Sequence, residues 1–277
     1  MHPNFGIFVD QINVFSQIFV PLANKMFAKI KQTNIPVMLS PDIQTFSGRK
    51  IIFGAHSNPI FWSKHSNKND IFVNFEPVYI SSWAENNPLY CKLLQEHAVI
   101  DYSKRNIDHC GDVVVLPVPP QFHHFPKNHK KNEVLFVGNP TSHRKIKLAK
   151  LTQNNVKVLF GFRLFGDQLI TEISKSKIFL SINDKNQNMI NLFRFALCGN
   201  SDTLFVGETD KLDEYPDFEP LIGISIFRNT EELVIGLKEL LADGEKLIRA
   251  IETQNELAAL HEEIYPNKLI KFLKRTL

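Results

Sequence analysis

The chain has 277 residues and a formal net charge of +3; 43% of its residues are hydrophobic and 22% are charged. These values are typical of a folded globular protein and exclude an intrinsically disordered chain, which is poorer in apolar residues and more highly charged. The three cysteines have no Cys-x-x-Cys spacing, which excludes a disulfide framework and a cysteine-based zinc site. We therefore expect reduced thiols in a cytoplasmic protein.

The first half of the chain predicts strands that alternate with helices. Short apolar runs typical of buried strands lie at Gly6–Val9, Val37–Leu39, Lys50–Phe53, Ile71–Phe75, Val99–Tyr102 and Val113–Leu116. Apolar residues at three- and four-residue spacing from Ile12 to Met26 predict a helix, which Pro21 is expected to kink or divide. Another helix is predicted at Leu89–Glu96.

A proline-rich and then basic stretch, Pro117 to Asn132, separates the two halves and is typical of an inter-domain linker. We therefore predict domains at residues 1–120 and 132–277. Its basic run of Lys127, Lys130 and Lys131 is a weak sign of nucleic-acid binding without a recognisable motif, so we expect no nucleic-acid partner.

The second half repeats the alternation. Its predicted strands are Val134–Val137, Lys157–Phe160, Ile178–Ile182, Thr203–Val206 and Ile224–Phe227. Its predicted helices are His143–Gln153, Asp167–Lys175, Met189–Cys198, Glu231–Leu241, Glu245–Leu260 and Asn267–Leu277. Continuous apolar strands between helices predict parallel sheets covered on both faces, and thus an α/β protein with two Rossmann-like domains facing a central cleft.

Gly138 and Asn139 follow a predicted buried strand, and Arg144 lies in the helix that comes next. A glycine there lets the backbone approach a ligand, and the first turn of a helix offers free N–H groups to a phosphate. Arg144 and Lys147 would add positive charge to such a site. The alternative is a plain turn with solvated basic residues.

Four further polar side chains lie at two predicted strand ends or on the helix between them. Asn183 ends one strand and Glu208 the next, while Asn191 and Arg194 share one face of the intervening helix. A carboxylate accepts hydrogen bonds from sugar or ribose hydroxyls, and an arginine neutralises a diphosphate. The alternative is a structural ion pair between Arg194 and Glu208.

In the first half, Glu76 follows a predicted buried strand and is a candidate general base. Ser103 and Asn106 fit turn chemistry better than a ligand site. His56 either faces a site or completes a turn, and the linker pair His123-His124 does not indicate a metal site. The basic, apolar C-terminal helix either packs on its own domain or rests on anionic lipid.

Together these stretches resemble bacterial GT-B glycosyltransferases of surface polysaccharide or lipooligosaccharide synthesis. The resemblance covers most of residues 70 to 210 in short motifs: Phe75-Glu76, Pro88-Leu-Tyr90, Ile100-Asp-Tyr-Ser-Lys-Arg-Asn-Ile107, Val137-Gly-Asn139 with Arg144, Lys177-Ile-Phe-Leu-Ser-Ile-Asn183, Asn191-Leu-Phe-Arg194 and Phe205-Val-Gly-Glu208.

The resemblance implies a nucleotide-sugar donor, as substrate and not as cofactor, bound by the second domain, and a saccharide or glycolipid acceptor bound by the first. The donor residues would be Gly138, Asn139, Arg144, Asn183, Asn191, Arg194 and Glu208, with Glu76 as catalytic base and no metal. The glutamate pair of retaining enzymes is not found, because Ser201 stands seven residues before Glu208. The enzyme would work in the cytoplasm, in peripheral contact with the inner face of the membrane. The alternative is a non-catalytic nucleotide- or saccharide-binding protein of an envelope-assembly complex.

Overall fold

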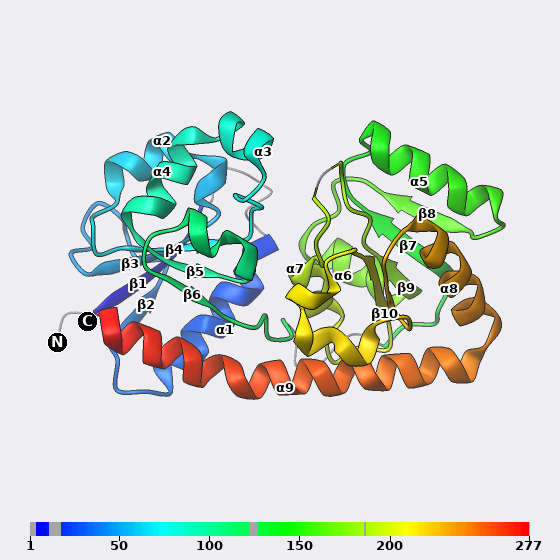
Figure 1. The fold of residues 1–277 in the computed structure, drawn as a ribbon. Helices are drawn as coiled ribbons and strands as arrows, with labels where there is room; N and C mark the ends of the chain where they lie inside the picture. The colour runs from blue at the N-terminus through cyan, green and yellow to red at the C-terminus, as the bar shows by residue number, and fades with distance from the viewer. Residues whose placement is uncertain (1–3, 11–17, 122–126, 186, 277) are drawn as a thin grey trace. The chain divides into compact units, whose positions relative to one another are not determined.

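The computed structural model describes residues 4–10, 18–121, 127–185 and 187–276 and divides into two compact units (Figure 1). Unit 1 consists of Met1–Pro117 and Glu263–Leu277, and unit 2 of Val118–Glu262. The last segment of the chain thus groups with unit 1, whereas the sequence analysis placed it in the second domain. Residues 11–17 of the predicted first helix, the pair His123-His124 and the last residue, Leu277, lie outside the described residues.

Unit 1 contains a six-stranded parallel sheet in the order β2-β1-β3-β4-β5-β6. Its strands are β1 Phe5–Val9, β2 Val37–Leu39, β3 Arg49–Phe53, β4 Ile71–Asn74, β5 Ala98–Asp101 and β6 Val113–Val115. Its helices are α1 Val20–Lys31, α2 Pro59–His65, α3 Ser81–Asn86 and α4 Pro88–Glu96, with the 3-10 turns η2 Ala55–Ser57 and η3 Lys104–His109.

Unit 2 contains a five-stranded parallel sheet in the order β11-β10-β9-β7-β8. The strands are β7 Asn132–Val137, β8 Val158–Gly161, β9 Ser176–Leu180, β10 Leu204–Glu208 and β11 Ile226–Phe227. The helices are α5 Ser142–Gln153, α6 Gly166–Ser174, α7 Leu192–Cys198 and α8 Thr230–Ala242, with 3-10 turns η4 Leu212–Glu214 and η5 Pro216–Leu221; α9 Gly244–Thr276 starts in unit 2 and ends in unit 1.

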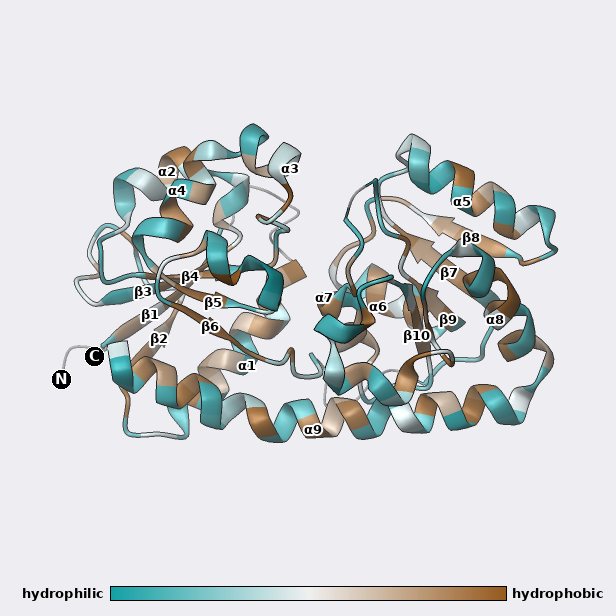
Figure 2. Ribbon diagram, viewed as in Figure 1, coloured by the Kyte–Doolittle hydropathy of each residue, from teal (hydrophilic) through white to brown (hydrophobic). Residues whose placement is uncertain are grey.

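The central strands β7, β9 and β10 of unit 2 are largely buried on both faces. This burial explains their apolar runs, which Figure 2 colours brown. Leu135 belongs to one hydrophobic cluster with Phe179 and Phe205, whereas its neighbour Phe136 belongs to a second cluster with Ile178. Successive side chains of a strand point to opposite faces, so each strand contributes to both clusters. The predicted α/β architecture with two Rossmann-like, parallel-sheet domains is confirmed.

Helices α1 and α9 each contain one proline. Pro21 lies in the first turn of α1, where a proline lacks only an N–H that has no helical partner, and residues 11–17 of the helix predicted before it lie outside the described part of the chain. Pro266 lies inside the 33-residue α9, which continues through the predicted break between residues 260 and 267. Tyr265 and Leu269 on either side of Pro266 are fully buried, and this packing offsets the lost backbone hydrogen bond.

The apolar residues at the end of α9 are not available to a lipid surface. Leu269, Phe272 and Leu273 are at most 3% exposed and belong to the part of the helix that groups with unit 1. Arg275 donates a hydrogen bond to Asp112 at 2.6 Å. Of the two alternatives for this helix, packing on the protein is therefore the one that the structure contains.

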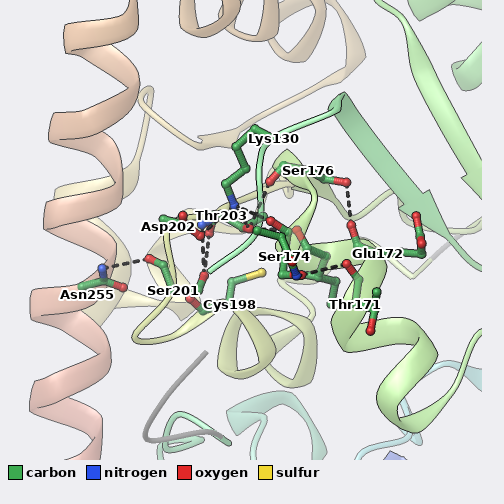
Figure 3. Close-up of polar contacts among 12 residues, drawn as sticks. Lys130, Thr171, Glu172, Ser174, Ser176, Cys198, Ser201, Asp202, Thr203 and Asn255 are labelled. Carbon is green, nitrogen blue, oxygen red and sulfur yellow. Dashed lines mark hydrogen bonds and ion pairs between the residues drawn. The ribbon is translucent and has the colours of Figure 1, made fainter. Parts of the chain in front are cut away.

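Lys130 of the predicted linker is used inside unit 2 (Figure 3). Its ammonium group donates hydrogen bonds to the Ser174 carbonyl at 3.0 Å, the Asp202 carboxylate at 2.7 Å and the Thr203 hydroxyl at 2.8 Å. The Thr203 hydroxyl in turn donates to the carbonyl of Ser176, where β9 begins. These contacts hold the entry to β7 against the amino ends of β9 and β10, so Lys130 serves packing here.

Candidate functional site

The candidate site of unit 2 lies where successive strands of the chain change their direction across the sheet. The chain leaves β7 for β8 on one side and returns to β9 on the other, so β7 and β9 flank a topological switch point. Open parallel sheets bind ligands outside the carboxyl ends of the strands at such a point. Gly138 follows β7, Asn183 follows β9 and Glu208 ends β10. The tertiary structure therefore gathers the predicted donor-side residues at one edge of the sheet.

Arg144 lies in the first turn of α5, whose N-cap Thr141 accepts a hydrogen bond from the Arg144 backbone N–H at 3.4 Å. Its guanidinium donates to the carbonyls of Ile182 at 3.1 Å and Asn139 at 3.3 Å, and to the Gln187 side-chain carbonyl at 3.5 Å. Burial lowers the pKa of Arg144, which the carboxylate of Asp184 partly counteracts. The side chain is thus held over the end of β9 by neutral acceptors.

Arg194 lies in α7 and directs its guanidinium toward the same place. It donates to the Leu180 carbonyl at 3.4 Å, and its guanidinium carbon lies 5.6 Å from the centroid of the Phe136 ring. The guanidinium carbon of Arg144 lies 6.0 Å from the same centroid. Burial, and secondly the charge of Arg144, lowers the pKa of Arg194 to about 9, so the side chain remains cationic at pH 7.

Gly138 lies close to both of these groups. A Cβ atom at this position would lie 3.2 Å from a terminal nitrogen of Arg194 and 3.1 Å from the Phe136 ring. A side chain at position 138 would therefore crowd the guanidinium and the ring, which would have to shift slightly. The prediction that this glycine lets a ligand approach the backbone stays a prediction.

Neither arginine has a carboxylate partner among the ion pairs of the described residues. Two half-buried cations beside one another repel, and the free N–H groups at the start of α5 add partial positive charge. An anion placed between these groups would relieve the repulsion. The edge of the sheet at β7 and β9 is therefore suited to a phosphate or diphosphate.

Glu208 pairs with Lys147, so the structure does not contain the alternative Arg194–Glu208 ion pair. The same carboxylate oxygen accepts from the backbone N–H of Asn183 at 3.3 Å, and the other accepts from the Thr230 hydroxyl at 3.3 Å. A carboxylate has about four lone-pair positions, and three are used here. The fourth can accept a hydrogen bond from a ligand hydroxyl.

The three asparagines of the predicted donor site differ in their use. Asn183 is 8% exposed, and its side-chain amide donates to the Glu208 carbonyl at 2.6 Å. Asn191 caps α7, because its side-chain oxygen accepts from the Arg194 backbone N–H at 3.0 Å. Asn139 is exposed and uses its carbonyl to hold Arg144. All three thus position neighbouring charged residues through bonds that are already formed.

In unit 1 the predicted base Glu76 follows β4 and has a histidine partner. His56, in the turn after β3, places Nε2 3.4 Å from a carboxylate oxygen of Glu76, and both side chains are about one quarter exposed. Asn74 and Asn106 donate to the Glu76 carbonyl at 3.0 and 2.9 Å. The sequence analysis assigned Asn106 to turn chemistry. In the structure its side chain is 1% exposed and holds the Glu76 backbone through this hydrogen bond.

Asp101, at the end of β5, lies beneath this arrangement. Its carboxylate accepts from the side-chain amides of Asn74 at 2.8 Å and Asn106 at 3.0 Å, and from the backbone N–H groups of Tyr102 and Ser103 at 2.7 Å. Burial nevertheless raises the pKa of Asp101 to about 6.

We expect this carboxyl group to make unit 1 less stable as the pH rises. Its pKa is 3.8 when unperturbed and about 6 in the folded protein, and each pKa unit corresponds to about 1.4 kcal/mol. The folded state therefore binds this proton more tightly than the unfolded chain does. Its contribution of about 3 kcal/mol is fully present below a pH of about 4 and is lost as the pH rises through about 6.

The measurement is chemical denaturation of the wild type and of Asp101→Asn over that pH range. All other titrating groups are common to the two proteins, so the difference between their free energies of unfolding reports Asp101 alone. Parallel curves for the two proteins would contradict the raised pKa.

The sequence analysis did not select two residues that lie at the carboxyl ends of the strands or bind a residue there. Asp10 ends the described part of the chain after β1, at the switch point of the first sheet, and is 3% exposed with a hydrogen bond from the Trp62 indole at 3.3 Å. The signal was available, since Asp10 is the first polar residue after a buried strand. Thr230, which binds Glu208, is separated from it by 22 residues and had no local signal.

Within the described residues, no group of three His, Cys, Asp or Glu side chains is arranged to hold a metal ion. None of the helices in the described part of the chain combines the length and the apolar character needed to cross a membrane.

No protein-family model matches the chain, and no curated protein matches it in sequence. Solved structures do match. The T4 phage β-glucosyltransferase in complex with UDP-glucose has a TM-score of 0.61 and 13% identity over 98% of both chains. The same enzyme with UDP and Mn²⁺ has a TM-score of 0.59 and 15% identity, covering 98% of this chain and 99% of that one. AviGT4, a glycosyltransferase of avilamycin A biosynthesis, has a TM-score of 0.54 and 13% identity, covering 96% and 98%. At these identities the likeness shows the fold, which is that of GT-B glycosyltransferases.

Proposed function

We propose that this protein is a glycosyltransferase that moves a sugar from a nucleotide-sugar donor to a saccharide or lipid-linked acceptor. The observation that carries the proposal is the pair Arg144 and Arg194 at the switch point of unit 2. Neither cation forms an ion pair among the described contacts, and Asp184 acts on Arg144 only through a weaker electrostatic interaction. The two arginines are suited to a diphosphate, the leaving part of a nucleotide sugar. The fold supports the proposal, because it is shared with an enzyme that binds UDP-glucose.

In this proposal the chain's own residues stabilise the departing diphosphate. Negative charge grows on the phosphate as the glycosidic bond breaks, and Arg144, Arg194 and the start of α5 are already oriented to receive it. Such preorganised charge lowers the barrier because no further reorganisation is needed. Glu208 would accept from a donor hydroxyl through its remaining lone pair. Donor binding by this set needs no metal ion, and metal independence is part of the proposal.

We further propose that unit 1 activates the acceptor. Glu76 is held by its backbone carbonyl and carries His56 beside its carboxylate, which leaves one carboxylate oxygen for the acceptor hydroxyl. Taking the hydroxyl proton as the new bond forms is the role of a general base. The protein would act in the cytoplasm, at the inner face of a membrane where the acceptor is lipid-linked, as in surface polysaccharide synthesis.

The test begins with melting curves in the presence of UDP-, GDP-, ADP- and CMP-linked sugars. A ligand at a hundred times its dissociation constant stabilises the folded state by about 2.7 kcal/mol, which a melting curve detects. Donor hydrolysis and transfer are then measured with oligosaccharide, lipid-linked saccharide and duplex DNA as acceptors, each with Mn²⁺ or a chelator. DNA is included because the T4 phage enzyme is a DNA-modifying one. Stabilisation without any turnover would favour the non-catalytic alternative, and no stabilisation would contradict both.

We expect Glu76→Gln to lower the turnover number by about a hundredfold or more at neutral pH, because general-base catalysis typically contributes a factor of this size. Donor-induced stabilisation should be unchanged, since Glu76 belongs to the acceptor side. Glu85→Gln, on the exposed side of α3, is the matched control and should leave turnover unchanged. Wild-type turnover by Glu76→Gln would assign the base to another residue.

A further inference from the structure

Strand β8 is one of the two edge strands of the unit 2 sheet and carries apolar side chains that face solvent. Of all the phenylalanines that the structure describes, only Phe160 and Phe162 are exposed, at 42% and 49%. Leu159, which also lies in β8, is 42% exposed. Leu159 and Phe160 point to opposite faces of the strand, so this edge presents apolar side chains on both of its faces. Single exposed apolar residues are common on proteins, whereas a cluster of three is typical of a contact surface.

The surroundings of this edge are basic. Residues 133 to 167 include six Lys and Arg and two acidic residues, Glu133 and Asp167 at the two ends. Lys147 and Lys150 are paired with Glu208 and Glu231. The exposed Lys145, Lys157 and Arg163 have no ion pair among the described contacts, and two of them flank the apolar segment.

Arg163 is held beside the second phenylalanine by an uncommon backbone conformation. Its φ angle is +56°, a region that residues other than glycine adopt rarely. The guanidinium carbon of Arg163 lies 5.1 Å from the centroid of the Phe162 ring. A cation and an aromatic ring are therefore presented to solvent together at the end of the strand.

Charge and side-chain type decide which partner fits. A second copy of this chain pairing along β8 would bring Lys157 and Arg163 against like charges. A nucleic acid would pair with the cations and stack on the two exposed phenylalanine rings, but it would leave the aliphatic side chain of Leu159 without an apolar contact. An anionic bilayer satisfies both features, because apolar side chains enter the acyl boundary while lysine and arginine remain with the lipid headgroups.

We propose that the β8 edge of unit 2, defined by Lys157, Leu159, Phe160, Phe162 and Arg163, binds the surface of an anionic lipid bilayer. This surface differs from the C-terminal end of α9, whose apolar residues are already buried. The proposal goes beyond the proposed transfer reaction and does not depend on it, because membrane binding is measured without donor or acceptor.

The experiment is co-sedimentation of the full chain with phosphatidylcholine vesicles, with and without phosphatidylglycerol. We expect binding only to the vesicles that contain phosphatidylglycerol, weakened by salt. Phe160→Ser/Phe162→Ser and, separately, Lys157→Glu/Arg163→Glu should each lower the partition coefficient by about tenfold or more. The matched control is Ile235→Ser/Ile248→Ser, which removes two isolated side chains, 59% and 57% exposed, from α8 and α9 and should bind as the wild type does.

Melting curves first establish that each variant is folded. The proposal would be overturned if the wild type does not bind vesicles that contain phosphatidylglycerol, or if it binds both kinds of vesicle equally. It would also be overturned if the folded phenylalanine and charge-reversal variants bind as well as the wild type does. So would vesicle-independent binding of a single-stranded oligonucleotide, or a dimer in solution, that the Phe160→Ser/Phe162→Ser change abolishes. Donor-induced stabilisation, measured in parallel without vesicles, tests the proposed function separately, so that either proposal can fail alone.

Discussion

Arg194→Ala is expected to lower the turnover number by roughly thirtyfold to a thousandfold while leaving the protein folded. Removing one preorganised charge from a departing anion costs about 2–4 kcal/mol of transition-state stabilisation. Donor affinity should fall as well, because the same charge meets the diphosphate before the bond breaks. Transfer kinetics and donor-dependent melting measure the two effects.

The melting temperature of Arg194→Ala without ligand distinguishes a binding role from a structural one. Among the described contacts the Arg194 guanidinium donates one hydrogen bond, to the Leu180 carbonyl at 3.4 Å, and it lies close to the like charge of Arg144. Removing it therefore leaves no buried carboxylate unpaired, and we expect equal or higher stability. Arg249→Ala, on the exposed side of α9, is the control. An unfolded Arg194→Ala protein, or a folded one with wild-type donor binding and transfer, would remove the donor site from the proposal.

Glu208→Leu is expected to have the largest effect on stability. Its side chain is 5% exposed and that of Lys147 is 17% exposed, so the substitution leaves the lysine charge without its partner in a largely desolvated place. Removing one member of a buried ion pair costs about 3–5 kcal/mol, and the partial exposure of Lys147 puts the expected loss near 3 kcal/mol. Chemical denaturation measures this loss directly.

A double substitution isolates the cause of that loss. Lys147→Met/Glu208→Leu removes both charges, and replacing a buried ion pair by apolar residues is often neutral. Most of the stability lost in Glu208→Leu should therefore return in the double variant, while donor binding should not. If the double variant is as unstable as Glu208→Leu, the hydrogen bonds to Asn183 and Thr230 account for the effect, and the ion pair does not.

The positions of the strands followed from local sequence. Each of the eleven described strands begins and ends within two residues of an apolar run predicted from the sequence. Strands buried on both faces need continuous apolar residues, so the pattern and the structure have the same cause. The short helix α2 could not be found in this way, because its seven residues are too few to show a helical period.

The candidate site residues could also be selected from the sequence, since polar residues directly after buried strands lie at the edge of a parallel sheet where ligands bind in such folds. Asn183, Glu208 and Glu76 were selected by this rule, and their roles stay predictions. The same rule applies to Asp10, which the sequence analysis did not select.

Which side chains touch was decided by the tertiary structure. Glu208 pairs with Lys147, 61 residues away along the chain, and not with Arg194. The partner of Glu76 is His56, on a neighbouring strand end. Local sequence specifies the conformation and burial pattern of a segment, because these depend on neighbours within a few residues. Contacts between distant residues depend on strand order and on the competition among several cations for one carboxylate, and both are settled only when the sheet is assembled.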